Sequence, residues 1–112
     1  MSDKIDKLSA AIRIGAKAGK QLKHNYADND FNSCALGAAG IGLSLFMPDK
    51  LDKTYNWTKI RQNLIDRFDG DKIISNPKTG EMNTIICTII YLNDHSNWTR
   101  EKIADWLESI GR

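Results

Sequence analysis

The sequence predicts an all-α fold, and three observations support this prediction. Apolar residues recur at steps of three and four along most of the chain. A glycine-rich apolar segment, residues 33–48, has the length of a buried helix. The chain has 112 residues, 41% of them hydrophobic, and only two prolines, which suits one domain without a linker. We therefore expect residues 1–112 to form a compact single-domain bundle of about five helices around a buried central helix.

The first predicted helix covers residues 3–26. Its apolar stripe recurs at helical spacing and consists of Ile5, Leu8, Ile12, Gly15, Gly19, Leu22 and Tyr26. Gly15 and Gly19 each cost about 1 kcal/mol of helix stability relative to alanine, which is tolerable where a neighbouring backbone approaches closely. We therefore expect both glycines to face the central helix.

The central helix is predicted between a cap at Ser33 and a stop at Pro48. Its glycines, Gly37, Gly40 and Gly42, raise the alternative of a phosphate-binding loop. Such a loop places glycines in a tight turn after an apolar strand, whereas the residues before this segment are polar. A membrane span needs about 20 apolar residues, and this segment is shorter. We interpret the glycines as positions where the first helix packs closely.

A third helix is predicted over residues 57–70, where Trp57, Ile60, Leu64 and Phe68 form a stripe and Gly70 favours an end. Residues 83–92 are harder to assign, because their β-branched side chains suit a buried strand as well as a helix.

We predict a helix over residues 83–92, capped by Asn83. The alternative is an α+β fold with one small hairpin around residues 71–90, since Asn-Pro and Thr-Gly stand between its two arms. The last predicted helix begins after a cap at Thr99, and its stripe runs from Ile103 to Ile110.

Three segments resemble a group of small, functionally uncharacterised bacterial proteins. They are C-A-L-G-A-A from Cys34, L-N-D from Leu92, and W-T-R-E-K-I-A-D-W-L from Trp98, in that order. The resemblance implies a bacterial or phage origin and assigns no functional residue.

The charge balance gives limited information about partners. Sixteen Lys and Arg against 14 Asp and Glu give a formal net charge of +2, too small by itself to indicate nucleic acid. Arg13, Lys17 and Lys20 lie at steps of four and three on the predicted exposed side of the first helix, without an acidic residue between positions 7 and 27. A solvated face is the commoner interpretation, and a docking face for an acidic protein partner is the sharper one. Three phosphate contacts would bind nucleic acid only weakly.

One set of residues suggests catalysis. Cys34 opens the central helix, where a thiol can have a lowered pKa, and His95 beside Asp94 or Asn93 could activate it. The ordinary interpretation is a small core cysteine and a solvated loop histidine, with Asn93 and Asp94 closing the turn before the last helix.

The expected function is therefore a non-enzymatic protein-interaction or regulatory module of a bacterium or phage. An acidic protein or a second copy in a homodimer is the expected partner, and a membrane is not. The alternative is a cysteine-dependent hydrolase or transferase using Cys34 and His95. Two histidines and two unclustered cysteines match no zinc spacing, so no metal or other cofactor is expected. The N-terminal sequence lacks the apolar stretch of a secretory signal, so the cytoplasm is the expected location.

Overall fold

The structure is a computed structural model that describes residues 5–28, 30–45 and 57–112. Within these ranges the helices and strands are α1 (Leu8–Ala16), α2 (Ala35–Gly42), α3 (Trp57–Phe68), β1 (Ile73–Ser75), β2 (Met82–Thr84), α4 (Ile85–His95) and α5 (Arg100–Ser109). The prediction of a mostly helical chain is confirmed. The antiparallel pair β1 and β2 departs from the all-α expectation and corresponds to the α+β alternative.

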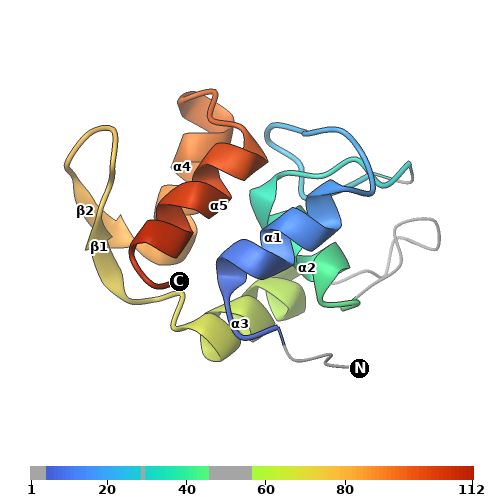
Figure 1. The fold of residues 1–112 in the computed structure, drawn as a ribbon, viewed down its shortest axis with the longest axis horizontal. Coiled ribbons are helices and arrows are strands. Elements are labelled where there is room, and N and C mark those ends of the chain that lie inside the picture. Colours follow the sequence, from blue (N-terminus) through green and yellow to red (C-terminus); the bar gives the residue numbers. More distant parts are fainter. Residues whose placement is uncertain (1–4, 29, 46–56) are drawn as a thin grey trace.

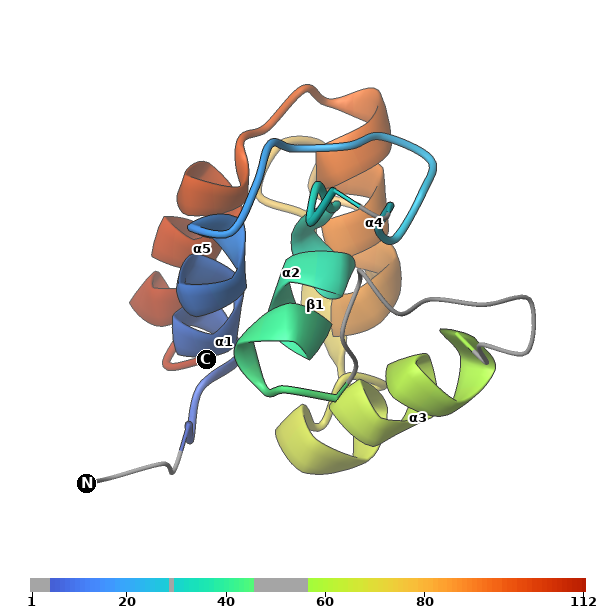
Figure 2. The same ribbon diagram turned by 90° about the vertical axis from the view of Figure 1, so that its right-hand side faces the viewer.

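The helices pack on one another around α2 (Figures 1 and 2). α1 lies between α5 and α2, α4 lies on the other side of α2, and the hairpin lies beside α4. The largest fully buried apolar side chains come from every helix: Leu8, Ile12, Leu36, Leu64, Ile85, Ile86, Ile89, Leu92, Ile103 and Leu107. One apolar core therefore joins the N-terminal and C-terminal helices.

α1 is shorter than the predicted helix over residues 3–26, of which residues 3 and 4 lie outside the described residues. It ends at Ala16, with Lys17 at its C-cap. In a continuing helix the Ala16 carbonyl would accept the N–H of Lys20. Instead that N–H donates to Asn32 Oδ1 at 2.8 Å, and the Ala16 carbonyl accepts from Arg100 Nη2 at 3.3 Å. Hydrogen bonds to residues outside α1 therefore end the helix, although the apolar pattern that predicted it continues to Tyr26.

α2 is the buried central helix that the sequence predicts, with different ends. Its residues from Ala35 to Gly40 are all buried. The N-cap is Cys34 rather than Ser33, because the Cys34 Sγ accepts the N–H of Gly37 at 3.4 Å. The helix ends at Gly42, and the predicted stop at Pro48 lies outside the described residues.

Glycine allows α1 and α2 to touch backbone to backbone, as predicted for Gly15. A Cβ atom placed on Gly15 would lie 1.7 Å from the Ala38 carbonyl oxygen, and one on Gly42 would lie 2.2 Å from that of Ala11. Both distances are far below van der Waals contact, so no larger residue fits without moving a helix.

Two other glycines face a loop rather than a helix. A Cβ on Gly19 would lie 2.3 Å from the Phe31 carbonyl oxygen, and one on Gly37 would lie 1.7 Å from that of Tyr26. The expectation that Gly19 faces the central helix is therefore wrong, because α1 has already ended. The expectation that the first helix packs at the glycines of the central helix is therefore confirmed for Gly42 and wrong for Gly37, where the loop packs instead.

The segment after α3 contains both structures that the sequence left open. Ile73 pairs with Thr84 and Ser75 with Met82, so the hairpin is shorter than the predicted alternative around residues 71–90. The apolar run that begins at Ile85 is helical throughout α4. Its N-cap is Thr84 rather than Asn83, since the Thr84 Oγ1 accepts the N–H of Cys87 at 3.1 Å.

The cap of α5 is confirmed, because Thr99 Oγ1 accepts the N–H of Lys102 at 3.0 Å. No helix within residues 5–28, 30–45 and 57–112 combines the length and the apolar character needed to cross a membrane.

Candidate functional site

The connection between α1 and α2, residues 17–34, is the longest irregular segment that the structure describes, residue 29 excepted. We call residues 17–34 the anchored loop. It crosses over the end of α2 from α1 to α4 (Figure 2). Backbone bonds hold it internally, since Leu22 N donates to Ser33 O and Cys34 N donates to Tyr26 O. Its conformation is therefore built from specific hydrogen bonds rather than from a regular element.

Arg100, the first residue of α5, attaches one end of the anchored loop to the helices. The residue is 8% exposed. Its Nη1 donates to both oxygens of Ser33, at 3.3 and 3.1 Å, and its Nη2 donates to the carbonyl of Gly19 at 2.6 Å in addition to that of Ala16. Burial lowers the pKa of Arg100, but a guanidinium keeps its charge in proteins. The planar guanidinium thus donates hydrogen bonds to both chain segments of the anchored loop, one around Gly19 and the other around Ser33.

Asn93 on α4 attaches the middle of the loop. Its side chain is 1% exposed, and Nδ2 donates to the Leu22 carbonyl at 2.8 Å. Its Oδ1 accepts from Gln21 Nε2 at 2.8 Å and from Ala35 N at 3.1 Å. The Gln21 side chain also reaches Trp98 O and Arg100 N. Asn93 therefore links α4, α2 and the anchored loop. It does not close the turn before α5, which was the expectation.

Asp94 fixes the turn of the loop that carries His24. Its Oδ1 accepts the backbone N–H of His24 at 2.9 Å and Asn93 Nδ2 at 2.8 Å. His24 has a left-handed backbone, with φ of 64°, an uncommon conformation for a residue with a side chain. The carboxylate therefore holds the loop in a conformation that it would not favour alone.

A pocket lies between this turn, the start of α2 and the last two turns of α4. Its cavity volume is about 60 Å³, and it is partly open to solvent. Its lining consists of His24, Asn25, Tyr26, Cys34, Ala35, Leu36, Ile89, Ile90, Asn93 and Asp94. Ala35 and Leu36 of α2 and Ile89 and Ile90 of α4 contribute apolar lining, and the polar lining comes from the anchored loop and from Asn93 and Asp94 of α4.

The pocket brings together part of the catalytic set that the sequence suggests. Cys34 and Asp94 both line it, whereas His95 is not among the lining residues. The His95 ring lies beside the ring of His24, with 5.5 Å between centroids, and beside that of Tyr91, at 5.4 Å. The histidine in the pocket is His24, which sequence analysis missed because it assigned residue 24 to a helix.

Cys34 has the environment of a structural thiol. Burial raises the pKa of Cys34 to about 11, although the hydrogen bond from Gly37 N acts in the opposite direction. The negative charge of Asp94 raises it further. A nucleophilic cysteine needs a lowered pKa, so this position opposes thiolate chemistry.

The three basic residues proposed for partner binding differ in their surroundings. Arg13 lies against α5, where its Nη2 is 2.6 Å from Asp105 Oδ1 and its Nη1 bonds Glu108. Those bonds raise the pKa of Arg13. Lys17 and Lys20 are exposed and stand at the start of the anchored loop, beyond the end of α1. Lys17 is the C-cap of α1, and Lys20 does not continue a helical stripe from Arg13, because the helix ends before it.

Within the described residues, no three histidine, cysteine or carboxylate side chains gather as a potential metal site. The three segments that carry the sequence resemblance do meet at the anchored loop: Cys34 is its last residue and caps α2, Asn93 and Asp94 hold its middle, and Arg100 holds its end. Comparison with protein-family models, curated proteins and solved structures found no match to this chain.

Proposed function

We propose that this protein is a non-enzymatic protein-interaction or regulatory module of a bacterium or phage, with the anchored loop as its binding segment. The observation that carries the proposal is the use of buried polar side chains, Arg100 and Asn93, to hold an irregular segment at the surface. Long irregular connections inside compact domains are typically functional, and binding residues concentrate on loops that a rigid scaffold positions.

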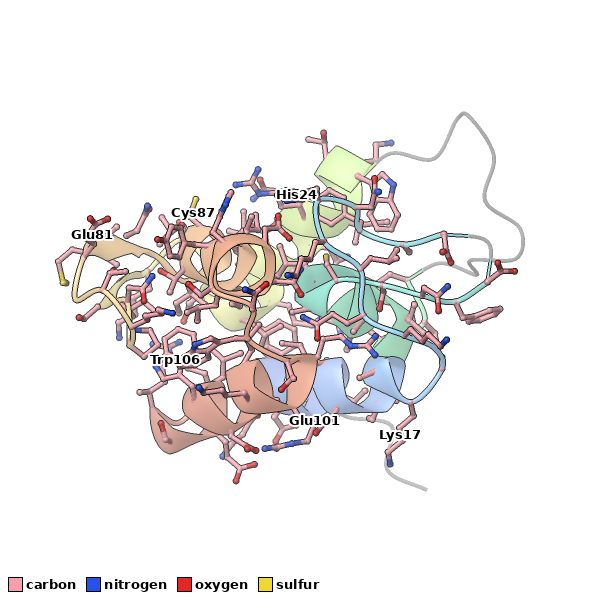
Figure 3. The ribbon with its side chains drawn as sticks, turned by 90° about the horizontal axis from the view of Figure 1, so that it is seen from above. Lys17, His24, Glu81, Cys87, Glu101 and Trp106 are labelled. Atoms are coloured by element: carbon pink, nitrogen blue, oxygen red, sulfur yellow. The ribbon has the colours of Figure 1, made fainter. Side chains whose placement is uncertain are left out.

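The chemistry of the loop favours an acidic partner. Lys17 and Lys20 are exposed, and Figure 3 shows Lys17 extending away from the body of the molecule. The positive charge of Arg13 is already paired with carboxylates of α5. The proposed surface therefore uses the two lysines rather than all three basic residues. Such a surface would bind through electrostatic attraction that weakens as salt rises.

The polar groups of the pocket support a binding role over catalysis. Cys34, Asn93 and Asp94 are each used in holding the loop or capping α2. A cysteine-dependent enzyme would require the Cys34 thiol to react at neutral pH, and its raised pKa opposes this.

The test compares two double charge reversals. Lys17→Glu with Lys20→Glu changes the proposed surface, and Lys72→Glu with Lys78→Glu makes the same change in net charge on exposed positions near the hairpin. A partner captured from the host by the unaltered protein is identified by mass spectrometry and titrated by calorimetry. We expect the first variant to lose at least about tenfold in affinity at low salt, and the second to lose much less.

Equal affinity of both variants for the partner would exclude the lysine surface. Sedimentation of the purified protein shows whether the partner is a second copy. Rapid alkylation of Cys34 at neutral pH would instead support the cysteine-dependent hydrolase or transferase that uses Cys34 and His95.

A further inference from the structure

The pocket lining contains the Asp94 carboxylate, whose ion pair with His24 is long. The Asp94 side chain is 12% exposed, and both of its bonds from N–H groups go to Oδ1. The Oδ2 lies 3.7 Å from His24 Nδ1, beyond hydrogen-bonding distance. A poorly hydrated carboxylate in this position attracts a cation or a hydrogen-bond donor.

Much of the remaining pocket lining is apolar. Leu36 comes from α2, Ile89 and Ile90 come from α4, and Tyr26 comes from the anchored loop. The Tyr26 ring stacks on Trp57 with 4.7 Å between centroids, so this wall is held by α3 as well. The pocket therefore has the composition typical of small-molecule sites, an apolar lining with a few polar groups.

We propose that the pocket binds a free monoamine with a compact apolar body, its ammonium group placed at Asp94. The carboxylate disfavours an anion, and a neutral alcohol would gain a hydrogen bond without the charge attraction. The cavity volume of about 60 Å³ admits only a compact group, so part of the apolar body would lie in the space that is open to solvent.

This binding site is separate from the lysine surface of the proposed function. His24 lies beside the end of α4, on the opposite side of the molecule from Lys17 (Figure 3). A failed amine titration therefore leaves the proposed partner surface untouched, and loss of partner binding leaves the pocket intact.

Titration by two-dimensional NMR of the full chain tests the proposal with three probes of the same shape. These are benzylammonium, benzyl alcohol and benzoate. We expect benzylammonium to shift the backbone signals of residues 34–36 and 89–94 and to bind at least about tenfold more tightly than benzyl alcohol. Benzoate should bind more weakly than either.

Asp94→Asn is the sharpest variant, since it removes the charge and keeps an oxygen that can accept the His24 N–H. In this variant the affinity for benzylammonium should fall to that for benzyl alcohol. If Asp94→Asn does not fold, Ile90→Trp at a partly exposed position of the lining should fill the site and weaken both probes.

Equal affinities for the amine and the alcohol would overturn the proposal. So would amine-induced shifts confined to α5, where Glu101, Asp105 and Glu108 offer exposed carboxylates.

Discussion

Two contacts hold the first half of the molecule together, and they use opposite chemistry. α1 packs against α2 at glycines, which have no side chain. Gly15 lies against the Ala38 backbone and Gly42 against that of Ala11. The anchored loop meets α4 and α5 through polar side chains, above all Arg100 and Asn93.

The difference lies in how each contact satisfies the backbone. Inside α1 and α2 the backbone N–H and C=O groups form hydrogen bonds within each helix. The contact between the two helices therefore needs only surfaces that fit closely together. An irregular loop leaves N–H and C=O groups to be satisfied by other means, because buried unpaired groups are costly. The polar side chains of α4 and α5 supply these bonds to the loop where it packs on the helices.

The largest effect is expected at the glycine contact. Gly15→Leu would force α1 away from α2, because even a Cβ would lie 1.7 Å from the Ala38 oxygen. We expect a loss of more than about 3 kcal/mol of unfolding free energy in urea denaturation. Ile14→Leu, at a position 47% exposed on the same helix, is the control and should change stability by less than about 0.5 kcal/mol. A small loss at Gly15 would mean that the helices can separate at little cost.

The next effect is expected at the polar contact. Arg100→Met keeps much of the buried volume and leaves the carbonyls of Ala16 and Gly19 and the Ser33 oxygens without this donor. We expect a loss of about 2–3 kcal/mol. Hydrogen exchange should quicken in residues 17–33 more than in α3, whereas uniform quickening would make Arg100 an ordinary core residue. Arg100→Lys should recover only part of the loss, because an ammonium group lacks the planar fork.

Cys34, where the loop joins α2, gives a pH-dependent effect. In the unfolded chain the thiol has its ordinary pKa of 9.0, and in the folded protein burial raises the pKa to about 11. Between these values the unfolded state binds fewer protons, so stability falls as pH rises from about 9 to about 11 and is unaffected below that range. The loss should reach up to about 2 kcal/mol near pH 10.5 and be absent in Cys34→Ser. Equal pH dependence of both proteins would show that Cys34 titrates normally.

The smallest effect is expected at the ion pairs between α1 and α5. Arg13 contacts Asp105 and Glu108 at the surface, where water and salt screen the attraction. Arg13→Gln should lower Tm less than either the Gly15 or the Arg100 variant, and the difference from the unaltered protein should disappear in about 1 M salt. A decrease that persists at high salt would indicate packing by the arginine side chain rather than charge.

The sequence predicted the helices whose own residues determine them. α3 begins at Trp57 as the stripe indicates, α5 begins after Thr99, and the buried α2 lies within the glycine-rich segment. The hairpin was harder to predict, because β-branched residues suit either structure and Thr84 both ends β2 and caps α4.

Helical spacing and capping chemistry by themselves determined the mostly helical class, because they act between residues a few positions apart. The end of α1 and the anchored loop depended on residues more than 60 positions away, such as Asn93 and Arg100. An arginine in the first turn of a helix is usually exposed, so its sequence position gave no sign that it would be buried. The pocket likewise exists only because the tertiary structure bends His24 back onto Asp94, a contact that local spacing does not contain.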